Sequence, residues 1–208
     1  MVGVLLVLGA IAVAAIALAG GTDEEGATGT GDVCRRQEFP AQGQRHLRAG
    51  QQPPNGFEYN SFPPTSGYHD ETPAIFDAYS QPVPERHLIH NLEHGGIVVQ
   101  YGKDVSQRTI DRIVQWWNQD PTGIVVSPLP NDPKAEPLRG KITLAAWTGR
   151  KTPITDEQQE VDPADAEPQK GHLAVCSRFD EEAFSDFRDD YRFRGPEPYR
   201  PSQLEPGG

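Results

Sequence analysis

The stretch from Glu85 to Tyr101 concentrates the side chains of this chain that could do chemistry. It reads E-R-H-L-I-H-N-L-E-H-G-G-I-V-V-Q-Y and holds three of the six histidines, His87, His90 and His94, beside the acid Glu93. Imidazole and carboxylate groups bind borderline metal ions and transfer protons near neutral pH. This crowding therefore indicates a metal site or a proton-transfer site.

His90 and His94 are four positions apart, a spacing that suits the chelation of one ion. The two side chains lie on one face if the segment is helical, and they point to the same side if it is extended, so both geometries permit coordination. A histidine from an earlier loop, His46 or His69, would complete such a site. The structural alternative is that these histidines only pack and hydrogen-bond beside a strand.

The segment from His90 to His94 also matches the inverted zinc-peptidase motif H-x-x-E-H, in which Glu93 would be the general base. That motif needs a helix and a third ligand from a later helix. Prolines before the segment and Gly95-Gly96 after it leave barely three helical turns, and the later acids lie in a stretch without a helical apolar face. A zinc hydrolase is therefore an alternative hypothesis, and we lean towards a protein that is not an enzyme.

The composition excludes some classes of protein. The chain has 208 residues and a net charge of −11, which argues against a nucleic-acid partner because such partners need clustered Lys and Arg. It contains 21 glycines and 20 prolines, so long Pro/Gly-rich loops are expected around a modest core. No phosphate loop, nucleophile elbow or dinucleotide motif is present.

The N-terminal segment predicts a link to the membrane. Residues 2–20 are apolar or glycine throughout, about the minimum length for a transmembrane helix, and a cleaved signal is the alternative. Residues 21–33 have the composition of a flexible linker. We expect a single-pass anchor with the C-terminal domain outside the cytoplasm.

Apolar patterns predict an α+β domain over residues 34–197 with a small mixed sheet and two main helices. Buried strands are expected over residues 97–101, 123–127 and 141–147. Ser106 is expected to cap a helix whose apolar residues follow the helical spacing up to Trp117, and strand, helix and strand together indicate a parallel crossover. The second helix is expected to start at Asp180, with Phe179 packing on Phe184.

Two other segments are predicted to lack regular structure. Residues 155–170 are acidic and poor in apolar side chains, which favours a mobile excursion, and residues 198–208 are Pro-rich and favour a disordered tail. Cys34 and Cys176 are candidates for a disulfide that would close one long loop, and two buried thiols are the alternative.

Several motifs follow one another along the chain after the linker. They are Q-G-Q-R-H (42–46), Y-N-S (59–61), P-P-T-S-G-Y-H (63–69), H-N-L-E-H-G-G (90–96) with the strand 97–101, A-A-W (145–147) and G-P-E (195–197). Together they resemble the bacterial domain-of-unknown-function 3105 family. The resemblance implies a domain carried mostly by actinobacteria and other bacteria on one membrane segment, without implying an activity. The chain departs from the family at Tyr68, where the family has proline.

The resemblance also implies which histidines belong to one shared site, because the family has histidine or an acid at those places. The predicted metal ligands are His46, His69, His90 and His94, with His87 and Glu93 as secondary candidates. Nitrogen ligands suit copper(II) or zinc(II), and Met1 is the only methionine, which excludes a thioether copper(I) site. The hypotheses are thus metal binding without turnover, a zinc hydrolase, and a non-catalytic envelope scaffold whose protein partner the sequence does not identify.

Overall fold

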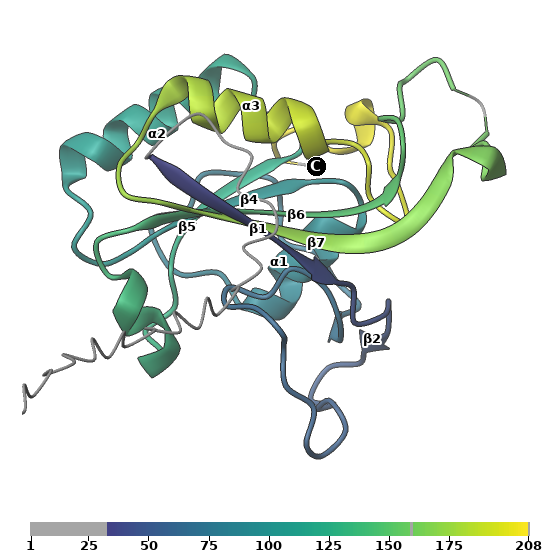
Figure 1. Ribbon diagram of the computed structural model, residues 1–208, viewed down its shortest axis with the longest axis horizontal. Coiled ribbons are helices and arrows are strands. Elements are labelled where there is room, and N and C mark those ends of the chain that lie inside the picture. Colours follow the sequence, from purple (N-terminus) through teal and green to yellow (C-terminus); the bar gives the residue numbers. More distant parts are fainter. Residues whose placement is uncertain (1–32, 159, 208) are drawn as a thin grey trace, which may run out of the picture.

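The computed structural model describes residues 33–158 and 160–207, and in this part of the chain five strands form one mixed sheet (Figure 1). Their spatial order is β1-β7-β6-β4-β5. Neighbouring strands are antiparallel except β4 and β5, which run parallel. The strands are β1 (Cys34–Pro40), β4 (Ile97–Tyr101), β5 (Ile124–Pro128), β6 (Ile142–Arg150) and β7 (Ala166–Cys176). The predicted α+β class with a mixed sheet is confirmed.

Three α-helices pack on this sheet within the same residues. Figure 1 shows α2 (Gln107–Gln119) and α3 (Glu181–Tyr191) over one face and α1 (Glu85–Glu93) against the other. A separate pair of two-residue parallel strands, β2 (His46–Leu47) and β3 (His69–Asp70), lies near α1. Short 3-10 turns occur at Pro133–Leu138, Pro163–Asp165 and Pro201–Gln203. The prediction of two main helices was therefore one helix short, because it left residues 85–93 undecided.

The helix α2 forms as its sequence predicts. The hydroxyl of Ser106 accepts a hydrogen bond from the backbone N–H of Thr109 at 3.3 Å, which satisfies one of the free donors at the helix start. Ile113, Trp116 and Trp117 then bury one face of the helix against the sheet. The chain passes from β4 through α2 to the parallel strand β5, so the expected crossover is present.

The helix α1 differs because its buried face is partly polar. It begins after Pro84, and no side chain in the described part of the chain caps its first turn. Six consecutive residues, 88–93, are buried, among them three apolar side chains of the core and the polar His90 and Glu93. Gly95 ends the helix with a φ of 88°, and a Cβ there would meet the backbone of Phe193 at 2.9 Å. A close chain crossing therefore fixes the end of α1.

Two expectations about irregular segments were wrong. Residues 166–170 are not part of a mobile excursion, because they begin β7 and pair with both β6 and β1. Residues 198–207 are not a disordered tail, because Leu204 is 1% exposed and its carbonyl accepts a hydrogen bond from the backbone N–H of Gly123 at 2.8 Å. Strand pairing therefore gives residues 166–170 a regular structure, and the burial of Leu204 does the same for residues 198–207, although both segments are polar in composition.

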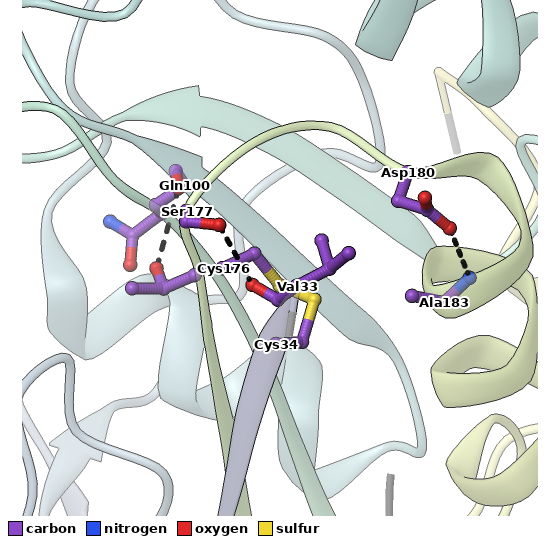
Figure 2. Close-up of a disulfide and its surroundings, with 8 residues drawn as sticks. Val33, Cys34, Gln100, Cys176, Ser177, Asp180 and Ala183 are labelled. Carbon is purple, nitrogen blue, oxygen red and sulfur yellow. Dashed lines mark hydrogen bonds between the residues drawn. A yellow bond between two sulfur atoms is a disulfide. The ribbon is translucent and has the colours of Figure 1, made fainter. Parts of the chain in front are cut away.

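Cys34 and Cys176 form a disulfide that joins the first described strand to the end of β7 (Figure 2). The backbone N–H of Ser177 also donates a hydrogen bond to the carbonyl of Val33 at 2.9 Å, as Figure 2 shows. The predicted membrane segment, residues 2–20, and the linker up to residue 32 lie outside the described residues. Among the residues that are described, no helix has the length and apolar character needed to span a membrane.

Candidate metal centre

The paired strands β2 and β3 bring the first two histidines together. His46 and His69 are direct register partners, although 23 positions separate them in the sequence, and their ring centroids lie 4.6 Å apart. Gly67, with a φ of 107°, turns the chain just before β3. This turn and the strand pairing place the buried His69 beneath the more exposed His46, whose side chain is 38% exposed.

The helix α1 supplies the other half of the group. His90 and His94 are one helical turn apart, and their Nε2 atoms lie 2.8 Å from each other. The ring centroid of His90 is 4.9 Å from that of His46 and 5.1 Å from that of His69. The structure thus brings together all four histidines that the sequence proposes as ligands, from three elements and an interval of 49 residues.

Backbone carbonyls orient three of the four rings. The Nδ1 atoms of His69, His90 and His94 lie 2.7, 2.7 and 2.9 Å from the carbonyl oxygens of Gly67, Asp70 and Glu197. A carbonyl only accepts hydrogen bonds, so each Nδ1 must carry the hydrogen. In His90 and His94 the neutral ring then presents the lone pair of its Nε2, which is the arrangement seen in histidine ligands of metals. The Nε2 of His69 instead faces the carboxylate of Glu93.

Glu93 lies between the two strands and the helix, fully buried. Its Oε2 is 3.0 Å from Nε2 of His46 and 3.0 Å from Nε2 of His69. Its Oε1 is also buried and has no hydrogen-bond partner among the described residues. Burial opposes ionisation of Glu93, but hydrogen bonds and positive charge from His69 and then His46 outweigh it and lower its pKa. Glu93 is therefore a carboxylate that compensates the charge of cations beside it.

His90 of α1 and His94, which caps the end of α1, are expected to be neutral when no metal is bound. Burial lowers the pKa of His90 to about 4, against a hydrogen bond to Asp70 that favours the charged form. Burial likewise lowers the pKa of His94. Desolvation penalises the imidazolium form, so both rings are available as ligands at neutral pH.

A family comparison assigns the domain. A family model described as "Protein of unknown function (DUF3105)" matches residues 51–203. The chain belongs to the DUF3105 family. No curated protein and no solved structure matches the chain. The DUF3105 match includes His69, His90, Glu93 and His94, whereas His46 lies before its first residue.

His87, a secondary candidate from the sequence, is not among the converging nitrogens of this DUF3105 domain. Its Nδ1 lies 2.6 Å from the carbonyl oxygen of Thr72, and its Nε2 lies 3.7 Å from the carboxylate of Asp70. It lies three positions before His90 in α1, and its ring nitrogens face Thr72 and Asp70 instead of the other histidines. His87 therefore serves as a structural side chain that fixes the loop before the helix.

The peptidase hypothesis gains a helix, but its candidate base Glu93 is buried and contacts two histidines. Residues 85–93 are helical, as H-x-x-E-H requires, yet Oε2 of Glu93 is already bonded to His46 and His69. A general base must reach a water that the metal activates. Of the later acids, Glu167 contacts Arg194 at 3.5 Å instead of the histidines. The arrangement fits metal binding better than peptide hydrolysis.

Sequence reasoning missed two residues at the rim of the DUF3105 site. Tyr199 stacks on the ring of His94 with centroids 3.7 Å apart, and Glu197 offers a carboxylate near His46 and Glu93. Both follow α3: Glu197 is the last residue of the predicted domain, and Tyr199 lies in the segment that was expected to be a disordered tail. The G-P-E motif that ends at Glu197 is the signal that could have indicated the second of them.

Proposed function

We propose that this domain binds a transition-metal ion, copper(II) or zinc(II), through His46, His69, His90 and His94, without catalytic turnover. One atom from each of His46, His69 and His90 lies within 4.8 Å of the others, a spacing that could hold an ion. His94 joins them through its contact with His90. Nitrogen ligands suit both metals.

The observation that carries the proposal is the contact between the Nε2 atoms of His90 and His94. Both Nδ1 atoms donate to carbonyl oxygens, so two lone pairs face each other at 2.8 Å in a buried place. Two lone pairs repel unless a cation lies beside both. Two nitrogens that each bind one ion at about 2 Å stand about 3 Å apart when they are neighbours in its coordination shell. The observed separation is therefore close to that of a chelating pair.

The experiment is elemental analysis of the full-length chain, purified in detergent without a polyhistidine tag and reconstituted with copper(II) or zinc(II). The wild-type protein should retain metal after dialysis, and the double variant His90→Ala/His94→Ala should lose it. His87→Ala is the matched control, because it removes a histidine of the same helix that lies outside the group. Equal metal content in the wild type and the double variant would refute the proposal.

We further propose that the domain lies outside the cytoplasm on a membrane anchor formed by residues 2–20. The apolar run supports the anchor, and the bond between Cys34 and Cys176 supports an oxidising compartment, where disulfides persist. In intact cells, a protease added outside should digest the domain while a cytoplasmic marker survives. Digestion only after the cells are lysed would contradict this topology.

A further inference from the structure

A second group of metal-ligand atoms lies beside the four histidines. One atom from each of His46, Glu93 and Glu197 lies within 4.8 Å of the others. These residues come from β2, from the last residue of α1 and from the segment after α3. Among the described residues, His46 is the member that this group shares with the group of His46, His69 and His90. The two groups therefore adjoin at His46 and differ in chemistry, since the second contains two acids.

The two carboxylates of this second group bring like charges close together. Oxygen atoms of Glu93 and Glu197 lie within 4.8 Å of each other, and Glu93 is 0% exposed. Like charges at that distance repel, and the repulsion increases where burial lowers the effective dielectric constant. A divalent ion between them would convert this repulsion into attraction to both acids.

An independent observation comes from the buried carboxyl group itself. Oε2 of Glu93 lies within hydrogen-bond distance of the Nε2 atoms of His46 and His69. Its buried Oε1 has no hydrogen-bond partner in residues 33–158 and 160–207. A buried, unpaired carboxylate oxygen is costly by roughly 1–3 kcal/mol or more, so it calls for a partner. A carboxylate can bind two ions, one through each oxygen. The free Oε1 is thus available to an ion other than the one near His69.

The backbone holds Glu197 in place for this role. Its N–H donates to the carbonyl of Glu93 at 3.1 Å, and its own carbonyl accepts from Nδ1 of His94 at 2.9 Å. The chain approaches so closely that a Cβ at Gly195 would lie 2.3 Å from the carbonyl oxygen of Glu93. Glu197 is therefore a fixed part of the site, although its side chain is exposed and water can reach the position beside it.

From this geometry we infer that the centre is dinuclear, with a second divalent cation bound at the rim by His46, Glu93 and Glu197. When both ions are bound, the inner ion keeps His69, His90 and His94, and the outer ion takes His46 and Glu197, because the lone pair of one imidazole nitrogen serves a single ion. Glu93 bridges the two ions, so the outer ion has one nitrogen and two oxygen ligands, with water in its open positions. Such a mixed set suits zinc(II) better than copper(I). The inference rests on the proposed function, because the second ion adjoins the histidine site and takes His46 from it.

The test is the number of zinc ions bound by the full-length chain, measured by equilibrium dialysis against zinc(II) and elemental analysis. Wild-type protein should bind about two equivalents, and Glu197→Gln, which preserves side-chain shape, should bind about one. Glu205→Gln is the matched control in the same C-terminal segment, because its carboxylate contacts Thr122 and not the histidines. It should keep both equivalents.

The outcomes separate this inference from the proposed function. Binding of no zinc by the wild type would overturn both. Binding of one equivalent by the wild type would overturn the second ion and leave the histidine site standing. Two equivalents in the wild type and also in Glu197→Gln would refute the assignment of the outer ion to Glu197. Thermal unfolding of each variant without metal shows whether the fold is intact, and Glu197→Asp, which keeps the charge, should restore part of the second equivalent.

Discussion

The helices α1 and α2 lie on opposite faces of one sheet and bury different kinds of side chain. Ile113, Trp116 and Trp117 of α2 enter an apolar core, and Ser106 caps the helix. By contrast, α1 buries His90 and Glu93 among its apolar residues, and the described residues provide it with no side-chain cap. The face under α2 therefore stabilises the fold. The face under α1 is less stable, because it holds buried polar groups in fixed positions.

Several buried polar atoms without partners lie on the face that α1 covers. Oε1 of Glu93, Oε1 of Glu85 and Nε2 of Gln100 have no hydrogen-bond partner among the described residues. Glu85 and Gln100 line a small cavity of about 10 Å³ between α1 and the sheet. Each such atom opposes folding by about 1–3 kcal/mol. Function and instability thus coincide on the face that α1 covers.

The largest expected effect is on the apolar face. Ile113 is 0% exposed beneath α2, so Ile113→Ala should lower the free energy of unfolding by about 2–5 kcal/mol through lost contacts and a new cavity. Denaturant unfolding measures this change. The metal content per folded molecule should stay the same, and a loss of metal would show that the two faces are not independent.

Metal binding should stabilise the other face selectively. An ion present at about 100 times its dissociation constant raises the free energy of unfolding by about 2.7 kcal/mol, because it binds only the folded state. Local opening should slow at the amides of α1 and β3 and stay unchanged at α2, where opening does not expose the ligands. Hydrogen exchange with and without a chelator distinguishes the helices, and equal protection of both would contradict this view.

Glu85 makes the α1 face sensitive to pH. Burial, followed by the negative charge of Asp132 and against the positive charge of Lys134, raises the pKa of its carboxyl to about 7 from an ordinary 4.5. Between these values the folded protein holds a proton that the unfolded chain has lost, so stability should fall as pH rises through this window.

Glu85→Gln removes the ionisable group and should flatten that pH dependence, with a gain of about 2 kcal/mol at alkaline pH. Unfolding midpoints recorded across the window measure the change. Asp132→Asn is a useful companion, because it should lower the pKa of Glu85 and give a smaller gain of the same sign. Identical pH profiles for the wild type and Glu85→Gln would refute the assignment.

The smallest expected effect is at the cap of α2. Ser106→Ala removes the hydroxyl that accepts from Thr109, which should lower the free energy of unfolding by about 1 kcal/mol. Metal binding should not change. A larger loss, or a change in metal affinity, would mean that α2 supports the site more directly than its position suggests.

The difference between the apolar face of α2 and the partly polar face of α1 also explains which helices could be predicted from the sequence. The cap at Ser106 and the spacing up to Trp117 identify α2, and Asp180 identifies α3, where Phe179 packs on Phe184 with ring centroids 4.9 Å apart. Both helices bury apolar side chains at regular intervals. Residues 85–93 carry no such pattern, because polar ligands occupy part of the buried face, so helix and extended strand could not be separated.

The site was predictable in its residue types and not in its arrangement. Crowded histidines and the family resemblance indicated the four nitrogens that the structure gathers. The exclusion of His87 and the presence of Glu197 depend on where β3 and the C-terminal segment cross α1, and local sequence does not encode those crossings. The strands β1 and β7 were also missed, because polar and charged residues occupy much of β1 and the first half of β7. Their pairing with each other and with β6 joins segments far apart in the sequence.

The bond between Cys34 and Cys176 determines how mechanical force enters the domain. It stands at the first residue of β1, so tension arriving from the residues before Val33 passes through a covalent link directly into β7, next to the centre of the sheet. The remainder of β1, and the loop from Pro40 to His46 that leads into the metal centre, lie beyond that link in the chain. A pull from the N-terminal side is therefore shared between β1 and β7 at the end where the two strands are covalently joined.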